Sequence, residues 1–307
     1  MNQTIHNYKN CIIMMVGLSG SGKSTLANRA ALEYDAHIIS SDAIRAEVFG
    51  DENDQLHNKE VFDILHERVH ESLKHGNSVI YDATNLNAKR RIAFLNQLKQ
   101  YKELQKICCV VATPYEVCVK NDSKRNRKVG KAVILKQMKQ FQMPFLNEGW
   151  DRINVKKMFT GESSHPILIL NKLEDMEHDC APYHLETIGK HITLVFEQAK
   201  NDDYRVKIAA LFHDLGKYYT KGFYNAKGEP SEVAHYYGHE NVSAYIYLTS
   251  LFYTCENQSN DIIWLIQNHM RPYLNGYEKW KIKQNPGLIR LLEHLNKYDL
   301  EGIITPS

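Results

Sequence analysis

The feature that most constrains the fold is a glycine-rich segment near the N-terminus, GLSGSGKS, which spans residues 17–24. It fits the pattern GxxxxGK[ST] in full, follows the apolar run CIIMMV and precedes a helix-like stretch over residues 23–34. Glycines let successive main-chain N–H groups close around phosphates, and the N-terminus of the following helix favours negative charge. The segment therefore predicts a strand–loop–helix unit that binds ATP or GTP.

Within this loop, Lys23 is expected to reach the β- and γ-phosphates, and Ser24 is expected to ligate Mg²⁺. The residues expected to line the nucleotide are Gly17, Ser19, Gly20, Ser21, Gly22, Lys23, Ser24 and Thr25.

The rest of the first half alternates short apolar runs with helical periodicity. Strands are predicted over residues 11–17, 37–40, 78–82 and 107–113, and helices over residues 23–34, 58–75 and 89–102. Strands separated by helices imply a parallel sheet with helices on both faces. This half is predicted to be an α/β domain over residues 1–163.

The pattern changes near Thr160, where TGESSHP indicates a boundary, ILIL suggests one last strand and APY a hinge. Beyond it, helices are predicted over residues 187–198, 202–215, 239–252, 261–269 and 287–298. The chain is thus expected to have two domains, with an all-α domain over residues 175–307.

Charge is distributed unevenly between these halves. Residues 1–160 carry 24 Lys and Arg against 17 Asp and Glu, whereas residues 161–307 carry 14 against 19. A basic first half suits polyanionic ligands. The six cysteines form no CxxC pair, and no apolar run approaches the roughly 18 residues that cross a bilayer. These features favour a cytoplasmic protein with reduced thiols and no membrane partner, and they do not predict an oligomeric state.

A candidate base follows the second predicted strand in the segment SSDAIR. Asp42 precedes Arg45 by one helical turn, so both lie on one face of a helix start. A carboxylate beyond the sheet edge is suited to accept a hydroxyl proton, and the arginine could hold a phosphate of the acceptor. The alternative interpretation is that Asp42 caps the helix.

The segment YDATNLNAKRR (residues 81–91) adds a third motif, and with it residues 10–158 resemble the 5′-kinase domain of the phage polynucleotide kinase-phosphatase family. The resemblance implies that Asp42 is the general base on the 5′-hydroxyl, that Arg45 contacts the neighbouring phosphate and that Asp82 is a supporting acid. It also implies a lid arginine over the ATP phosphates. Arg125 and Arg127 both fit, and the sequence does not choose between them.

The second half contains AALFHDLGK (residues 209–217), in which His213 and Asp214 are adjacent. His191 precedes them, and His239, His269 and Asp299 follow in helical contexts. Histidine nitrogens with carboxylates suit divalent transition metals such as Mn²⁺, Co²⁺, Ni²⁺ or Zn²⁺. His213 and Asp214 can face one ion if the chain bends after them, which Gly216 would permit.

These motifs resemble the HD metal-dependent phosphohydrolase superfamily over residues 175–307. The resemblance implies that His191, His213, Asp214 and Asp299 ligate a first metal. It places His239 and His269 for a second ion or for the substrate phosphate, and Lys217 for phosphate contact.

Together the two resemblances imply an enzyme that heals nucleic-acid ends. The kinase would use ATP to phosphorylate 5′-OH ends of RNA or DNA, and the HD domain would remove a 3′-phosphate or open a 2′,3′-cyclic phosphate. One alternative is a nucleotide or small-alcohol kinase fused to an HD nucleotidase. Another is an HD half that senses nucleotides and regulates the kinase.

Overall fold

The structure is a computed structural model, and it describes residues 10–52, 54, 56–158, 166–180, 185–254 and 257–304. The chain divides into two compact units: Met1–Ile134 with Pro144–Phe159, and Leu135–Met143 with Thr160–Ser307.

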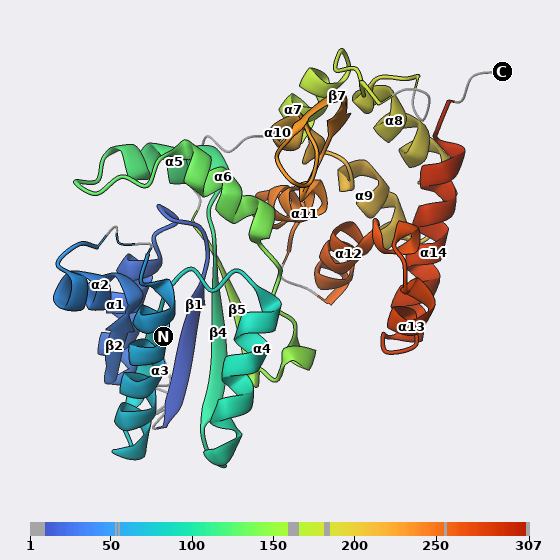
Figure 1. The fold of residues 1–307 in the computed structure, drawn as a ribbon. Helices are drawn as coiled ribbons and strands as arrows, with labels where there is room; N and C mark the ends of the chain where they lie inside the picture. The colour runs from blue at the N-terminus through green and yellow to red at the C-terminus, as the bar shows by residue number, and fades with distance from the viewer. Residues whose placement is uncertain are drawn as a thin grey trace, which may run out of the picture. The chain divides into compact units, whose positions relative to one another are not determined.

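A five-stranded, all-parallel sheet with the order β2-β3-β1-β4-β5 forms the centre of the first unit (Figure 1). The strands are β1 (Cys11–Val16), β2 (Ala36–Ser40), β3 (Ser78–Asp82), β4 (Gln105–Ala112) and β5 (Arg152–Lys157). The helices are α1 (Lys23–Tyr34), α2 (Ser41–Phe49), α3 (Asn58–Lys74), α4 (Ala88–Gln97) and α5 (Tyr115–Ser123), with single 3₁₀ turns η1 (Leu98–Gln100) and η2 (Leu146–Glu148). Helix α6 (Lys131–Gln140) begins in the first unit, and its part from Leu135 onward belongs to the second. The predicted α/β class is confirmed.

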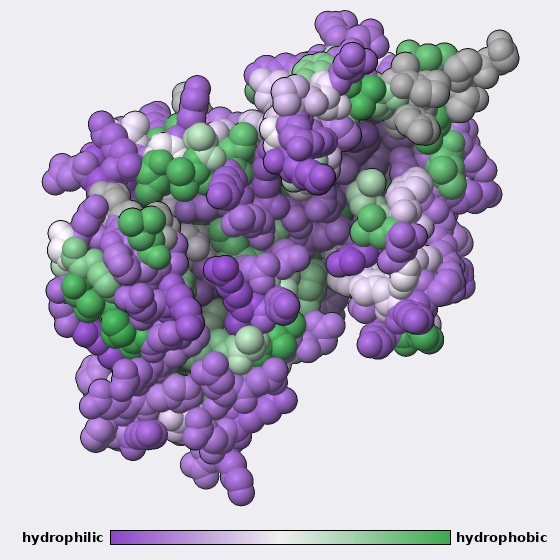
Figure 2. All heavy atoms as spheres, in the orientation of Figure 1, coloured by the Kyte–Doolittle hydropathy of each residue, from purple (hydrophilic) through white to green (hydrophobic). Residues whose placement is uncertain are grey.

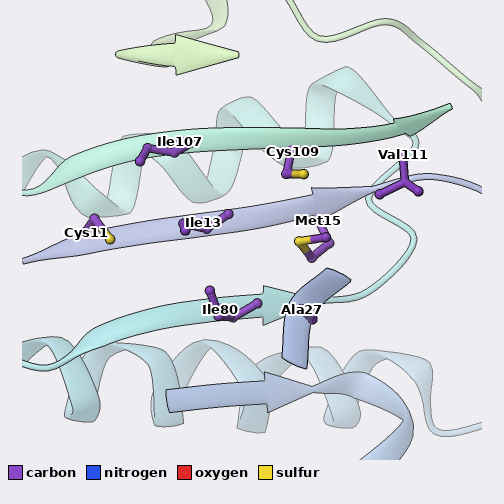
Figure 3. Close-up of a cluster of buried hydrophobic side chains, with 8 residues drawn as sticks. All are labelled: Cys11, Ile13, Met15, Ala27, Ile80, Ile107, Cys109 and Val111. Atoms are coloured by element: carbon purple, nitrogen blue, oxygen red, sulfur yellow. The ribbon is translucent and has the colours of Figure 1, made fainter. Parts of the chain in front are cut away.

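The core of this sheet follows the period of two along each strand. Cys11, Ile13 and Met15 of β1 point to one face, where they pack with Ala27 of α1 and with side chains of the neighbouring strands (Figure 3). All six residues of β1 are buried, as expected for the central strand of a sheet covered on both faces. The carboxyl ends of parallel strands share one edge, so the loop after β1, the start of α2 after β2 and the end of β3 lie together.

The second unit is predominantly helical, which confirms the predicted helical second domain. Its helices include α7 (Pro166–Leu173), α8 (Ile188–Gln198), α9 (Tyr204–Phe212), α10 (Lys217–Thr220), α11 (His239–Thr249), α12 (Asn257–Asn268), α13 (Tyr277–Lys281) and α14 (Pro286–Glu301), with 3₁₀ turns η3 (Ala199–Asn201) and η4 (Arg271–Tyr273). Helix α9 packs against α8, α11, α12 and α14. Its buried side chains therefore place its C-terminal end, where His213 and Asp214 follow, in the middle of the helices.

Two features of the second unit differ from the sequence-based expectation. The ILIL segment is wrong as a strand, because it lies in α7, where Pro166 opens the helix and the buried Ile169 and Leu173 recur one turn apart. An antiparallel hairpin of β6 (Gly222–Tyr224) and β7 (Pro230–His235) interrupts the helices. The predicted boundary at TGESSHP, apart from Pro166, and the predicted hinge at APY lie outside the described residues.

The surface drawn in Figure 2 is mainly hydrophilic, with separate hydrophobic patches. Within the described ranges, no helix combines the length and the apolar character needed to span a membrane.

Candidate active sites

The glycine-rich loop connects β1 to α1 and has the backbone of a phosphate-binding loop. Gly20 and Gly22 have φ of 78° and 93°, in the left-handed region that favours glycine. A Cβ atom at Gly20 would also lie 2.3 Å from the carbonyl oxygen of Cys118 in α5. Gly22 is the N-cap of α1, so the first main-chain N–H groups of that helix are available for an anion.

Lys23, Ser24 and Asp82 form a connected polar group at this edge of the sheet. Lys23 Nζ donates to the Leu18 carbonyl oxygen at 2.8 Å, and Ser24 Oγ donates to Asp82 Oδ2 at 3.0 Å. Burial lowers the pKa of Lys23, while the Asp82 carboxylate opposes that shift. Burial raises the pKa of Asp82, while Lys23 and the Ser24 hydroxyl oppose it. The Ser24 hydroxyl and the Asp82 carboxylate are hard oxygen donors of the kind that Mg²⁺ prefers.

Asp42 lies in the first turn of α2 and is flanked by two arginines. Its Oδ1 accepts a hydrogen bond from Arg45 Nη1 at 3.0 Å, and its Oδ2 lies 2.8 Å from Arg127 Nη1. The N-cap position of α2 belongs to Ser40, so the interpretation that Asp42 caps the helix is wrong. Arg45 is buried, and its Nη2 donates to Asn58 Oδ1 at 2.7 Å, which fixes the guanidinium beside Asp42.

The two lid arginines follow α5 and occupy different environments. Arg127 is mostly buried and pairs with Asp42 and, at 3.5 Å, with Glu52. Arg125 is exposed. Its positive charge adds to the burial that lowers the pKa of Lys23, and it opposes the burial that raises the pKa of Asp82. The structure therefore separates two residues that the sequence left equivalent.

The motif that follows β3 holds the loop together. Asn85, with φ of 50°, donates from Nδ2 to the Met15 carbonyl oxygen at 2.8 Å, and the carbonyl of Thr84 accepts a hydrogen bond from Gly17 N at 3.1 Å. Asn87 caps α4 by accepting from Arg90 N at 3.0 Å. These contacts give the motif a structural role beside the phosphate-binding loop.

Arg91 of the same motif is fully buried and has a structural partner. Its Nε and Nη2 donate to the two carboxylate oxygens of Glu148 at 2.8 and 2.6 Å, and its Nη1 donates to the Asn85 carbonyl at 2.9 Å. Trp150 Nε1 donates to the same carboxylate at 3.1 Å. A buried bidentate pair of this kind joins α4 to the segment before β5.

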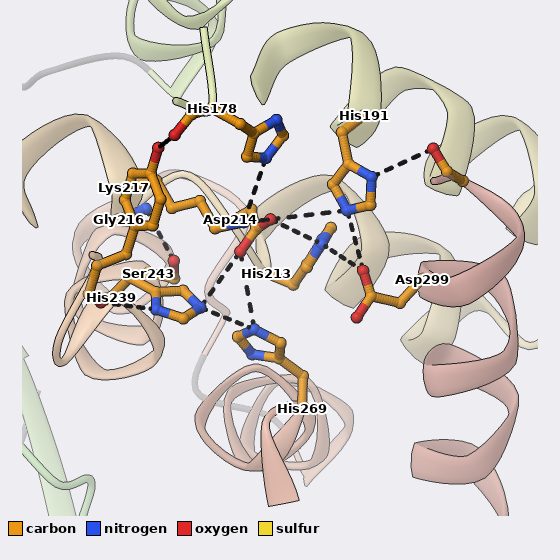
Figure 4. Close-up of polar contacts among 12 residues, drawn as sticks. His178, His191, His213, Asp214, Gly216, Lys217, His239, Ser243, His269 and Asp299 are labelled. Carbon is orange, nitrogen blue, oxygen red and sulfur yellow. Dashed lines mark hydrogen bonds and ion pairs between the residues drawn. The ribbon is translucent and has the colours of Figure 1, made fainter. Parts of the chain in front are cut away.

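The second candidate site collects six side chains from five helical segments. Figure 4 shows them pointing toward one another: His191 from α8, His213 and Asp214 after α9, His239 at the start of α11, His269 after α12 and Asp299 from α14. All six are buried. They form two groups, His191 with His213 and Asp299, and Asp214 with His239 and His269, and the ligand atoms of each group lie within 4.8 Å of one another.

The donor atoms of the first group have the spacing of metal ligands. His191 Nε2 lies 2.9 Å from Asp299 Oδ1, and His213 Nε2 lies 3.4 Å from the same oxygen. Asp214 Oδ2 completes the group, 3.7 Å from His191 Nε2 and 3.4 Å from His213 Nε2. Four donors about 2.1 Å from one ion lie about 3.0 to 3.4 Å apart, so the predicted ligands of a first metal fit such an ion.

The other oxygen of Asp214 faces the second group. Asp214 Oδ1 lies 3.3 Å from His239 Nε2 and 3.8 Å from His269 Nε2, and the two histidine nitrogens are 3.1 Å apart. One carboxylate thus faces both groups, an arrangement suited to bridging two cations.

Backbone carbonyls set the orientation of the histidine rings. His213 Nδ1 lies 2.8 Å from the carbonyl oxygen of Ala210, and His239 Nδ1 lies 2.8 Å from the carbonyl oxygen of Tyr236. His269 Nδ1 lies 2.7 Å from the carbonyl oxygen of Ile266. A neutral ring that donates from Nδ1 presents an unprotonated Nε2, which is the form that binds a metal. His213 Nε2 is buried without a hydrogen-bond partner, which suits an atom that can bind a cation.

The charges of the cluster also favour a cation. Burial alone would lower the pKa of His213, but the Asp214 and Asp299 carboxylates raise it to about 10. Burial would raise the pKa of Asp214, but Lys217 and His213 hold it well below its usual range. Burial and the neighbouring histidines lower the pKa of His269 to about 3, so this ring is a neutral ligand at pH 7. The site therefore has two carboxylates with strong demand for positive charge.

The expected role of Gly216 in bending the chain is wrong. Its φ of −65° is an ordinary helical value. A Cβ atom there would lie 2.2 Å from the His239 carbonyl oxygen and 2.8 Å from Ser243 N. Glycine is required at this position because α11 approaches the backbone directly, which also brings His239 to Asp214.

Lys217, predicted to contact phosphate, lies beside the metal ligands. Its Nζ is 2.7 Å from Asp214 Oδ2 and 3.4 Å from His178 Nε2, and it lies over the Tyr236 ring. Two neighbours were not predicted: His178, and Tyr273, whose hydroxyl donates to Asp299 Oδ2 at 2.6 Å. Both occur in the histidine-rich half, but neither has a spacing that identifies it from sequence.

The first unit is a P-loop nucleotide-binding domain of the kinase type. It has the glycine-rich loop, the helix N-terminus that follows the loop, and the hydrogen-bonded pair of Ser24 and Asp82. Residues 12–144 match the AAA domain family, and residues 160–300 match the HD domain family. The chain therefore combines a P-loop kinase-type domain with an HD domain. The first implies ATP and Mg²⁺, and the second implies a divalent metal, which the His and Asp groups could hold.

Solved structures are similar to parts of this chain. The Pnkp1/Rnl/Hen1 RNA repair complex contains a chain with 26% identity and a TM-score of 0.37, over 46% of this chain and 46% of that chain. A fungal RNA kinase has 13% identity and a TM-score of 0.36, over 55% of this chain and 45% of that chain. The Mycobacterium tuberculosis APS kinase CysC has 19% identity and a TM-score of 0.35, over 49% of this chain and 91% of that chain. No curated protein matches the chain.

Proposed function

We propose that this chain is a bifunctional enzyme that heals nucleic-acid ends. Its kinase-type domain would transfer the ATP γ-phosphate to a 5′-hydroxyl, and its HD domain would hydrolyse a 3′-phosphate or a 2′,3′-cyclic phosphate. The observation that carries the kinase proposal is Asp42, a carboxylate held between Arg45 and Arg127 in the same unit as Lys23 and Ser24. A carboxylate with two cations suits an acceptor hydroxyl that has a phosphate beside it.

In the kinase step, the loop amides and Lys23 would bind the ATP phosphates, and Ser24 and Asp82 would hold the magnesium ion. Bound Mg²⁺ would offset the charge that develops on the transferred phosphoryl group. Asp42 would accept the proton of the 5′-hydroxyl as it attacks, and Arg45 would orient the adjacent phosphate. The exposed Arg125 of the same loop would be the arginine on the ATP side.

In the hydrolytic step, His191, His213, Asp214 and Asp299 would hold the first cation, and Asp214, His239 and His269 a second. A bound divalent metal would lower the pKa of its water toward about 7 and so supply a nucleophile at neutral pH. Lys217 would exchange its contact with Asp214 for the substrate phosphate. Tyr273 would keep Asp299 Oδ1 directed at the cluster by bonding the other oxygen.

The two activities have a common purpose. RNA breaks that leave a 5′-hydroxyl and a 2′,3′-cyclic phosphate need both steps before they can be joined, and a chain with both domains supplies them together.

The test uses an RNA with a 5′-hydroxyl and a 2′,3′-cyclic phosphate, incubated with the full chain, ATP and Mg²⁺, with Mn²⁺, Co²⁺, Ni²⁺ or Zn²⁺ added separately. We expect a 5′-phosphate in the presence of ATP and a ring-opened or dephosphorylated 3′ end with at least one transition metal. Transfer to small alcohols or nucleotides but not to RNA or DNA would favour the metabolite kinase instead. A kinase without any metal-dependent phosphate release would favour a sensing role for the HD domain.

A further inference from the structure

Asp122, near the end of α5, determines the shape of the lid loop. Its Oδ1 accepts a hydrogen bond from Val129 N at 3.1 Å and its Oδ2 accepts one from Gly130 N at 2.9 Å. Its own carbonyl accepts from Arg125 N at 3.1 Å. The Asp122 residue is only 2% exposed, and these part-buried, charge-assisted bonds close residues 122–130 into a defined loop.

The base of this loop is fixed against the phosphate-binding loop. Asn121 Nδ2 donates to the Gly20 carbonyl oxygen at 2.9 Å. The backbone of Cys118 lies so close to Gly20 that a methyl group would not fit between them. The lid arginines therefore extend from a support whose position relative to the nucleotide site is set by direct contacts.

From this support the arginines reach different places. Arg127 reaches Asp42 Oδ2 at 2.8 Å, across from Arg45, which holds Oδ1. Arg125 is exposed. One arginine thus faces the proposed base, and the other lies at the surface of the loop.

We propose that Arg127 is an acceptor-side residue: together with Arg45 it forms a pair that binds a phosphate next to the acceptor hydroxyl, and Asp122 positions it. This inference rests on the proposed kinase function of Asp42. The ligand chemistry is a phosphate mono- or diester on the acceptor, as in a nucleoside 3′-phosphate or an oligonucleotide.

The pairing with Asp42 suits an exchange of partners. The Asp42 side chain is 48% exposed and that of Arg127 is 15% exposed, and ion pairs that reach solvent are weak. A guanidinium binds phosphate through two parallel N–H donors, so an incoming phosphate can replace the carboxylate. Arg127 then leaves Asp42 Oδ2 free to accept the hydroxyl proton. An acceptor without a phosphate would leave the base paired.

The test compares Arg127→Ala and Arg125→Ala with the unmodified chain. Equilibrium binding is measured for a labelled 5′-OH oligonucleotide, for adenosine 3′-monophosphate, for adenosine and for ATP. We expect Arg127→Ala to weaken binding of the oligonucleotide and the 3′-monophosphate about ten- to hundredfold, with adenosine and ATP binding nearly unchanged. Arg125→Ala should weaken ATP binding and spare the acceptors.

Two further variants separate position from charge. Lys128→Ala removes a cation from the same loop at an exposed position, and it should change acceptor binding by less than about twofold. Asp122→Asn keeps the shape of the side chain and weakens its bonds to Val129 N and Gly130 N. It should raise the KM for the oligonucleotide more than it lowers kcat, and Arg127→Lys should retain part of the acceptor affinity.

The inference is overturned if Arg127→Ala weakens ATP binding and leaves oligonucleotide binding unchanged, because Arg127 would then serve the ATP side. It is also overturned if Lys128→Ala has an equal effect, since only the total charge of the loop would matter. Failure of the proposed function looks different: the unmodified chain would phosphorylate no 5′-OH end. The binding comparison would still decide the place of Arg127.

Discussion

At the scale of single residues, the kinase proposal depends on Asp42. Its carboxylate makes no capping contact in α2 and faces two guanidinium groups. We expect Asp42→Asn to reduce phosphoryl transfer by about 10²- to 10⁴-fold, because general-base catalysis contributes on that order. ATP binding should change less than about twofold, since the ATP contacts lie at Lys23 and the loop amides. Single-turnover transfer and calorimetric ATP titration measure the two effects, and a parallel loss of ATP affinity would instead assign Asp42 a structural role.

In the HD domain, Asp214 is the residue that faces both ligand groups. Asp214→Asn keeps the size of the side chain and removes the charge, so we expect the chain to lose most of its bound transition metal and its phosphohydrolase activity. Metal content after equilibrium dialysis, measured by atomic emission, checks this directly. His235→Ala, in the β6–β7 hairpin and outside the ligand set, is the matched control and should keep its metal. Undiminished metal binding by Asp214→Asn would refute the site.

The positions of some candidate site residues were predictable from the sequence and those of others were not. The Lys23 and Ser24 positions follow from a motif whose spacing fixes the backbone. The choice between Arg125 and Arg127 depends on how Asp122 folds the lid loop, and no local pattern encodes that. Gly216 was assigned to a bend, but its reason is the approach of α11, a contact between residues far apart in the chain.

At the scale of secondary-structure elements, the motif between β3 and α4 has a structural partner in Glu148. Glu148→Ala would leave the Arg91 guanidinium buried without its carboxylate. Removing one member of a buried pair costs about 3–5 kcal/mol, so we expect a correspondingly lower free energy of unfolding. Denaturant unfolding monitored by circular dichroism measures this free energy. Glu33→Ala, at an exposed position of α1, is the control and should change the free energy of unfolding by close to zero. A change below about 1 kcal/mol would contradict the structural role.

The contact between α11 and the turn after α9 gives a second prediction at this scale. Gly216→Ala places a methyl group against the backbone at His239, so we expect a loss of about 1–3 kcal/mol in stability and weaker metal binding. Lys190→Ala, at an exposed position of α8, is the control. A Gly216→Ala protein with unchanged melting temperature and metal affinity would show that α11 can move away freely.

Secondary-structure elements were predicted correctly from the sequence where the apolar pattern of a segment matched its burial in the structure. The apolar runs of β1, β3 and β4 lie in the middle of the sheet and read as strands. The edge strand β5 carries charged residues in RINVKK and was missed. ILIL was predicted to be a strand because four consecutive apolar residues fit a buried strand or a helix equally well. In the structure it is part of the helix α7, which packs against α8.

At the scale of the whole molecule, the chain builds its two candidate sites from separate sets of residues. No residue of the phosphate-binding loop belongs to the histidine–aspartate cluster, and each set lies within its own compact unit. We propose that the two sites work independently on the two ends of one break.

One complementation measurement tests this claim most directly. An RNA with a 5′-hydroxyl and a 2′,3′-cyclic phosphate is incubated with ATP, Mg²⁺ and Mn²⁺ and with Asp42→Asn, with Asp214→Asn or with an equal mixture of both, and the two ends are read by mass spectrometry. We predict that Asp42→Asn modifies only the 3′ end, that Asp214→Asn modifies only the 5′ end and that the mixture modifies both. Loss of both modifications in either single variant would contradict the account.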